Sequence, residues 1–165
     1  MMIKKICLLG AFSVGKTSLV AQYVHSIFSD KYLSSVGVKI SKKNMTVGET
    51  ELTLVLWDME GKDIYASVNF SYLRGAMGYF VVVDGTRKET LEVGLSLHEQ
   101  AVSLVGPLPC CFLINKVDIE NDWEVTGSML EEVSAQGIEV LRTSAKIGRG
   151  VDEAFTALAV KMCAK

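Results

Sequence analysis

The feature that most constrains the fold of this chain is the octapeptide GAFSVGKT at residues 10–17, which has the form GxxxxGKT. A strand-like run at residues 3–9 precedes it, and an amphipathic run at residues 18–25 follows it. Glycines let the backbone turn tightly and aim N–H groups at phosphate oxygens, and the next helix adds its positive N-terminal end. We therefore predict a phosphate-binding loop, in which Lys16 reaches the β- and γ-phosphates and Thr17 holds Mg²⁺. The predicted phosphate contacts come from Ser13, Val14, Gly15, Lys16, Thr17 and Ser18.

Strand-like and helical stretches alternate along the chain. Apolar runs suited to buried strands lie at residues 6–9, 79–84, 110–115 and 138–143, and helical patterns lie at residues 18–25, 91–105, 128–136 and 151–162. This alternation predicts a parallel sheet covered by helices on both faces. Two further runs, at residues 39–47 and 51–57, are joined by a tight turn at Gly48-Glu49 and predict an antiparallel hairpin.

Polar or glycine residues follow four of the predicted strands. Gly10, Asp58, Asn115 and Thr143 each stand at a strand end, and in open sheets of this class ligands bind beyond the carboxyl ends of the strands. A carboxylate at position 58 suits the shell of a magnesium ion beside Thr17. We therefore expect one site at this edge of the sheet.

Two short motifs after buried strands suggest which base the site accepts. In Asn115-Lys116-Val117-Asp118, the Asp118 carboxylate can accept two hydrogen bonds from N1 and N2 of guanine, which adenine cannot donate. In the segment 143–146, TSAK, we predict that the Ala145 N–H donates to the guanine carbonyl oxygen. The predicted base-site residues are Asn115, Lys116, Asp118, Ser144, Ala145 and Lys146.

Composition narrows the class of protein. A length of 165 residues suits one domain, and a net charge of −2 argues against binding to nucleic acid or to an anionic membrane. The basic and apolar start resembles a signal peptide only superficially, and no apolar run is long enough to span a membrane. The four cysteines lack metal-ligand spacing and are expected to be small buried side chains in a reducing compartment. We expect a cytoplasmic protein, monomeric by default.

In these motifs the chain resembles the Ras superfamily of small GTPases, and most closely its Rab branch. The likeness runs from about residue 4 to about residue 162 and includes the segments FSDKY at 28–32, SVGV at 35–38, YLRGA at 72–76 and VDGT at 83–86. It implies the P-loop NTPase fold, an α/β fold with a six-stranded, mostly parallel sheet, one antiparallel edge strand and about five helices on both faces. The domain would cover residues 1–165.

The resemblance also implies a ligand and partners. GTP or GDP with Mg²⁺ would order two switch segments: Phe28 would pack against the guanine, Ser35 would face the magnesium and the γ-phosphate, and Gly61 would contact the γ-phosphate. Effector, exchange-factor or activating proteins would bind these segments, with residues 36–40 and 65–72 forming most of the effector face. For the four apolar side chains of the second segment, a place in the core is the alternative; they are Tyr65, Val68, Phe70 and Tyr72.

The chain departs from the family pattern where hydrolysis is catalysed. The family usually has DTAGQE where residues 58–63 read DMEGKD, with Met59 and Glu60 in the middle, so that Lys62 replaces the glutamine that orients the attacking water. A lysine donates but cannot accept a hydrogen bond, so slow intrinsic hydrolysis is expected, with Lys62 and Lys16 as the catalytic candidates. Phe12 and Ser13 stand where small residues are usual, and the Phe12 ring is expected to crowd an activating arginine.

Two alternatives to a slow switch stay open. An unorthodox residue, Glu60 or Lys62, could support efficient hydrolysis, or the chain could be an interaction module that is constitutively loaded with one nucleotide or holds none. Cys163, third from the end, forms neither a C-a-a-X box nor a double-cysteine tail, and Met2 is not the glycine that myristoylation requires. We therefore expect no lipid anchor motif.

Overall fold

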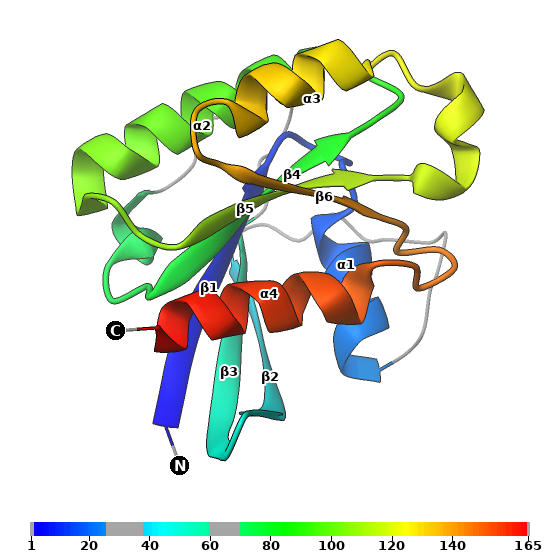
Figure 1. Cartoon of the computed structure of the whole chain (residues 1–165). Helices are drawn as coiled ribbons and strands as arrows, with labels where there is room; N and C mark the ends of the chain where they lie inside the picture. The colour runs from blue at the N-terminus through cyan, green and yellow to red at the C-terminus, as the bar shows by residue number, and fades with distance from the viewer. Residues whose placement is uncertain (1, 26–37, 60–69, 165) are drawn as a thin grey trace.

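The computed structural model of the chain describes residues 2–25, 38–59 and 70–164. These residues form one six-stranded sheet in the order β2-β3-β1-β4-β5-β6 (Figure 1). Neighbouring strands are parallel except at the β2 edge, where β2 runs antiparallel to β3. The strands are β1 (Met2–Gly10), β2 (Val38–Val47), β3 (Thr50–Met59), β4 (Gly78–Asp84), β5 (Cys110–Asn115) and β6 (Glu139–Thr143). The predicted fold class and hairpin are confirmed.

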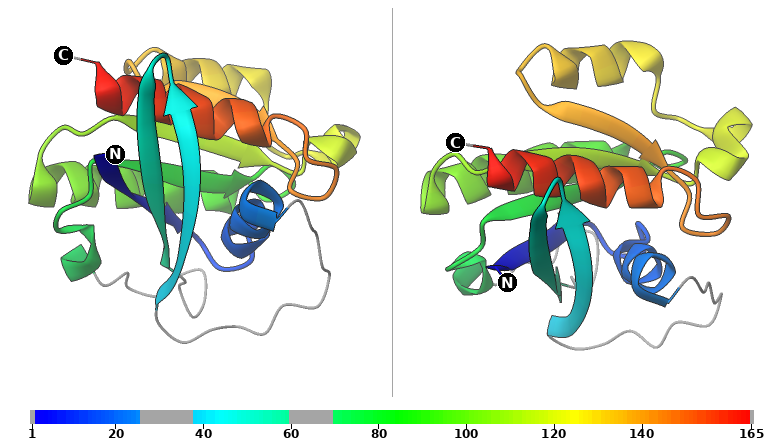
Figure 2. Two further views of the ribbon diagram at one scale, coloured as in Figure 1. Left: turned by 90° about the horizontal axis from the view of Figure 1, so that it is seen from below. Right: turned by 60° about the horizontal axis from the view of Figure 1, so that its bottom comes forward.

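Helices cover both faces of the sheet, as the alternating pattern predicts. In the views of Figures 1 and 2, α1 and α4 lie on one face, and α2 and α3 lie on the other. The described helices are α1 (Lys16–His25), α2 (Glu89–Val105), α3 (Gly127–Ser134) and α4 (Val151–Cys163), with short 3-10 helices η1 (Phe70–Leu73) and η2 (Val117–Asp122). Within the described ranges, no helix has both the length and the apolar character that crossing a membrane requires.

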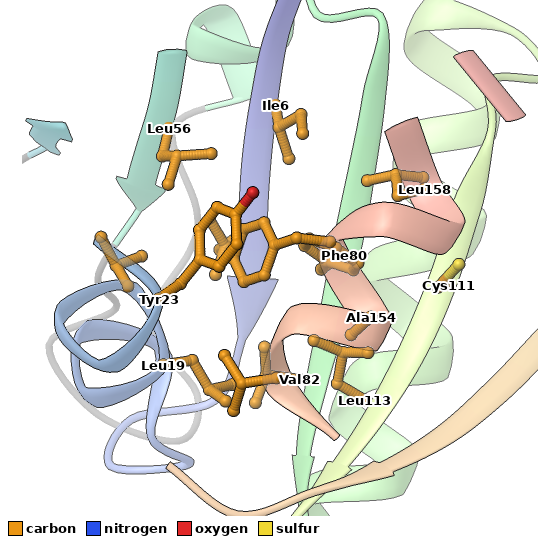
Figure 3. Packing of buried hydrophobic residues seen from close by; sticks show 14 of the residues in the cluster. Ile6, Leu19, Tyr23, Leu56, Phe80, Val82, Cys111, Leu113, Ala154 and Leu158 are labelled. Atoms are coloured by element: carbon orange, nitrogen blue, oxygen red, sulfur yellow. The ribbon is translucent and has the colours of Figure 1, made fainter. Parts of the chain in front are cut away.

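Strand alternation divides the core into two clusters. Successive side chains of a strand point to opposite faces, so Ile6 and Leu8 of β1 pack beneath α1 and α4, whereas Cys7 and Leu9 pack beneath α2 and α3. Figure 3 shows the first cluster, where Tyr23 of α1 and Phe80 of β4 point into the same space. The Tyr23 ring also stacks on Phe155 of α4 with a centroid distance of 3.8 Å. This cluster holds α1, and with it the loop before α1, against the sheet.

Several helix boundaries differ from the predicted ones by one or two residues, and two of these differences have a clear local reason. Helix α1 begins at Lys16, inside the GKT triplet, because the Leu19 N–H already donates to the Gly15 carbonyl at 2.9 Å. Helix α3 ends at Ser134, two residues early, because the chain turns there into Gly137, whose φ is +83°. The amphipathic patterns located the helices, and backbone hydrogen bonds decided where each one ends.

The cysteines are free thiols, and two of the four, Cys7 and Cys111, are fully buried as expected. Cys110 and Cys163 are half-buried. Burial raises the pKa of Cys7 to about 11 and the pKa values of Cys110 and Cys111 to about 12. Near neutral pH these three thiols stay protonated and behave as small apolar side chains.

His98 is held in a half-buried position at the end of the sheet where β4 and β5 begin. Its Nδ1 lies 2.8 Å from the hydroxyl of Tyr79, and its ring meets Phe112 edge to face. Burial lowers the pKa of His98, outweighing the opposite effect of Glu99, and burial raises the pKa of Tyr79. The phenol and the imidazole are therefore both neutral near pH 7, and the hydrogen bond between them gives His98 a structural role.

This arrangement predicts a specific loss of stability in acid. Because the folded protein binds the His98 proton less readily than the unfolded chain does, the free energy of unfolding should fall as the pH drops below about 6.5, the ordinary pKa of histidine, toward the lower folded value. Urea unfolding at several pH values checks this. His98→Gln, which removes the titrating ring, should give a smaller decrease over that range, and an unchanged decrease would contradict the prediction.

Candidate functional site

The predicted site residues meet at one edge of the sheet. Asp84, Asn115 and Thr143 end neighbouring strands and lie opposite one another in the β4-β5-β6 register. Gly10 ends β1, and Asp58 is the next-to-last residue of β3. Helix α1 and the connections that follow β5 and β6 lie on this same side of the molecule in Figure 1. The carboxyl ends of the strands therefore form the edge at which the sequence predicts a ligand.

The loop at residues 10–17 needs both of its glycines. Gly10 has φ +153°, and a Cβ there would stand 2.6 Å from the Val82 carbonyl oxygen. Gly15 has φ +109°, and a Cβ there would stand 2.2 Å from the side-chain nitrogen of Asn115. Any larger residue would push the loop away from β4 or from the β5 loop. The turn predicted from GxxxxGKT is thus present, held close to two neighbouring strands.

Lys16 is folded back into this loop. Its ammonium donates to the carbonyls of Gly10 at 3.0 Å and Ala11 at 2.9 Å, and the residue is 4% exposed. A buried cation of this kind is costly unless polar groups surround it, so the loop supplies a local environment built for charge. Val14 points its side chain into the apolar core, which leaves only its backbone to meet a ligand, while Ser13 is exposed with φ +61°.

Thr17 and Asp58 meet although 41 residues separate them in the chain. The Thr17 hydroxyl donates to Oδ2 of Asp58, whose residue is 1% exposed. Both groups offer oxygen atoms at the mouth of the loop, and oxygen ligands are what hard divalent cations such as Mg²⁺ prefer. The donor set therefore fits the metal role predicted for the pair.

Asn115 joins the loop at residues 10–17 to the ends of β5 and β6. Its side-chain N–H donates to the Val14 carbonyl at 3.0 Å, and its Oδ1 accepts from the Thr143 hydroxyl and from the Ala145 N–H, each at 3.2 Å. The residue is 2% exposed. One amide thus fixes three chain segments. Because the Ala145 N–H is engaged here, its predicted contact with a guanine carbonyl stays a prediction.

The Asp118 carboxylate is oriented by the neighbouring connection. The hydroxyl of Ser144, a fully buried residue, donates to Asp118 Oδ1 at 2.7 Å and accepts from the Ile147 N–H at 3.2 Å. Asp118 itself is half-buried, and Lys146 is exposed. The two segments predicted to recognise a base, 115–118 and 143–146, therefore lie in direct contact.

A charged network beside this pair was missed at the sequence level. Asp84 is fully buried and accepts hydrogen bonds from Lys116 at 2.7 Å, from Arg87 at 3.0 Å and from the backbone and hydroxyl of Thr86. Burial alone would raise the pKa of Asp84, but these donors outweigh it and lower the pKa. The available signal was the same as for Asp58, a carboxylate directly after a buried strand.

Several predicted residues lie outside the described ranges: Phe28, Ser35, Glu60, Gly61 and Lys62. Within the described part of the predicted effector face, Phe70 and Tyr72 pack against the core cluster beneath α2 and α3. For these two, the alternative of a place in the core is supported. Ile40 of β2, by contrast, is 51% exposed.

The chain is similar in sequence to known proteins of one family, the Ras family. The Ras family model matches residues 5–164. The chain is 31% identical over 160 residues to the Ras-related protein Rab-13 of Bos taurus, covering 94% of this chain and 77% of that protein. It is 30% identical over 161 residues to the Ras-related protein Rab-21 of Dictyostelium discoideum, covering 96% and 76%. It is 29% identical over 160 residues to Rab-21 of Homo sapiens, covering 96% and 71%. The chain therefore belongs to the Ras family and is a small GTPase near the Rab branch.

Proposed function

We propose that this GTP-binding switch takes GTP and GDP together with Mg²⁺ and hydrolyses GTP slowly. The observation that carries the proposal is the contact of Thr17 with the buried Asp58 at the mouth of the loop that contains Lys16. A hydroxyl, a carboxylate and a lysine at one loop are the groups that a magnesium-bound polyphosphate requires.

Lys16, Thr17 and Asp58 have separate tasks in this proposal. The Lys16 ammonium, already removed from water, offsets the charge of the β- and γ-phosphates. Thr17, Ser35 and, through the surrounding shell, Asp58 would hold Mg²⁺, which neutralises charge on the phosphate oxygens when bound. Backbone N–H groups of residues 13–18, at the positive end of α1, would bind the same phosphates. Positioning and charge neutralisation supply most of the catalysis in this reaction class.

Asp118 selects the base in this proposal. Ser144 holds one oxygen of its carboxylate at 2.7 Å, which fixes the side chain as an acceptor for N1–H and the N2 amino group of guanine. Adenine would leave this half-buried carboxylate facing an acceptor atom, which costs binding energy. Phe28, Asn115, Lys116, Ala145 and Lys146 complete the proposed base site.

Slow hydrolysis follows from Lys62. With no acceptor at this position, the attacking water is not held by a side chain that accepts from it while donating to the phosphate. GTP would then persist and keep the switch segments in the form that partner proteins recognise, with exchange factors rather than hydrolysis setting the cycle.

Two measurements distinguish the proposal from its alternatives. Chromatography of nucleotide released from freshly purified protein should find GDP or GTP, and finding none would favour an empty interaction module. Single-turnover GTP hydrolysis should be slower than in Rab proteins that carry the usual glutamine. A rate equal to theirs that Glu60→Ala then abolishes would instead establish efficient catalysis by an unorthodox residue.

Asp58→Asn should weaken magnesium-dependent retention of nucleotide. Removing a partner that orients a metal ligand typically lowers metal affinity by about 10- to 100-fold, so GDP should dissociate correspondingly faster at limiting Mg²⁺. Stopped-flow release of fluorescent GDP across a magnesium titration measures the effect. Glu51→Gln, an exposed carboxylate at the other end of β3, is the matched control and should behave as wild type. Identical magnesium dependence in wild type and Asp58→Asn would contradict the metal assignment.

A further inference from the structure

Arg87, in the turn between β4 and α2, contacts two separate parts of the proposed site with one guanidinium. Its Nη2 donates to the Phe12 carbonyl at 3.0 Å, and its Nε donates to Asp84 Oδ2 at 3.0 Å. Phe12 belongs to the loop at residues 10–17 and stands 75 positions away in the chain. The side chain of Arg87 is 32% exposed. It therefore acts at the surface of the site, outside the apolar core.

Asp84 also contacts the connection after β5 at residues 115–118, which we call the base loop. Its Oδ2 accepts from both Arg87 and the Lys116 ammonium, the latter at 2.7 Å, while its Oδ1 accepts from Thr86. Lys116 has φ +77°, a left-handed conformation that few residues other than glycine adopt. Its hydrogen bond to a fully buried carboxylate helps to hold that conformation. A continuous chain of contacts thus runs from the Phe12 carbonyl through Arg87 and Asp84 to Lys116.

This connection parallels a second one. Asn115 binds the Val14 carbonyl, two residues beyond Phe12, from the same β5 connection that carries Lys116. The loop at residues 10–17 is therefore linked to the base loop in two places. One link is the buried amide of Asn115, and the other is the partly exposed bridge through Arg87 and Asp84. Arginine suits the second link because its rigid fork donates in two directions at once, whereas a lysine offers one nitrogen.

We propose that Arg87 is a positioning residue of the nucleotide site. It holds the phosphate-binding loop and, through Asp84, the Lys116 ammonium in one arrangement, so that a bound nucleotide meets both halves of the site already placed and leaves slowly. This inference rests on the proposed function, because it assigns the two linked loops to phosphate and base.

Release of preloaded fluorescent GDP in excess Mg²⁺ tests the role of Arg87. Arg87→Ala should release GDP about tenfold faster, the loss expected for a hydrogen bond that involves a charged group. Arg87→Lys keeps a charge near Asp84 but cannot also reach Phe12, and should fall between Arg87→Ala and wild type. The matched control is Lys161→Ala, which breaks a comparably exposed ion pair with Glu139 at 2.6 Å; it should stay within about twofold of wild type, as a surface pair does.

A double-mutant cycle with Lys116→Ala tests the route through Asp84. If Arg87 acts through the shared carboxylate, the combined effect on GDP release should be smaller than the product of the two single effects. The proposal would be overturned if the double variant showed the full product of the two single effects on GDP release, or if Arg87→Ala released GDP at the wild-type rate. A fall in the melting temperature of Arg87→Ala without a change in release would also overturn it. Failure of wild type itself to retain GDP would instead overturn the proposed function.

Discussion

Asp118→Ala is expected to lower the affinity for GDP by about 100- to 10,000-fold, because the variant loses two hydrogen bonds from guanine to a charged acceptor, each contributing about 1.5–3 kcal/mol. Binding of ADP, which makes neither bond, should not become weaker. The variant should therefore bind the two nucleotides with similar, low affinity. The Ser144 hydroxyl would lose its acceptor on Asp118, but the Ile147 N–H contact would still hold that connection.

Isothermal titration with GDP and ADP in Mg²⁺ measures both affinities. Asp122→Ala is the matched control, because Asp122 is an exposed carboxylate on the same short helix, η2, and it should bind GDP as wild type does. If Asp118→Ala retained the wild-type preference for GDP, the carboxylate would not be the group that selects the base.

The double variant Phe12→Gly with Lys62→Gln is expected to hydrolyse GTP much faster than wild type. Glutamine restores a side chain that can accept from the attacking water while donating to the phosphate, and so orients that water. Glycine at position 12 removes the half-buried ring from the phosphate-binding loop, where an inserted arginine would add about 10³- to 10⁵-fold in the presence of an activating protein.

Single-turnover hydrolysis of radiolabelled GTP, with and without Rab-activating proteins, separates the two contributions. Lys62→Gln alone should raise the intrinsic rate, and only the double variant should respond fully to an activating protein. Lys42→Gln makes the same chemical change on an exposed lysine of β2 outside residues 36–40 and should leave the rate unchanged. No increase in either variant would mean that the block to hydrolysis lies elsewhere than at Phe12 and Lys62.

The sheet and its ligand edge follow from patterns that are local in sequence. The apolar runs that became β4 and β5 are buried along nearly their whole length, which is what parallel strands between two helical layers require. Because neighbouring parallel strands end at the same edge of the sheet, their polar end residues, Asp84 and Asn115, lie side by side there. The spacing of Lys16 and Thr17 after Gly10 was equally informative, because the motif itself specifies the turn.

The contacts that fasten the site together could not be predicted in the same way. Asn115 contacts the Val14 carbonyl 101 positions away in the sequence, and Arg87 contacts the Phe12 carbonyl 75 positions away. Contacts between residues so far apart in the sequence produce no periodic pattern from which they could be predicted. Lys116 adopts a left-handed backbone conformation, which a lysine in the sequence does not predict. Asp84 was visible as part of a family-like segment, but its role depends on combining the local donors Thr86 and Arg87 with Lys116, 32 positions away, which only the fold brings to it.

We propose that Lys16, Thr17 and Asp58 bind a magnesium-bound phosphate chain while Asp118 selects guanine. Calorimetric titration of the nucleotide-free wild-type protein with GDP and with ADP, each in Mg²⁺, tests it most directly. A site built around hydrogen bonds to one base should reject the other by about 10⁴-fold or more. We expect tight, magnesium-dependent binding of GDP and no measurable binding of ADP at micromolar protein. Equal affinity for the two nucleotides would show that neither assignment is right.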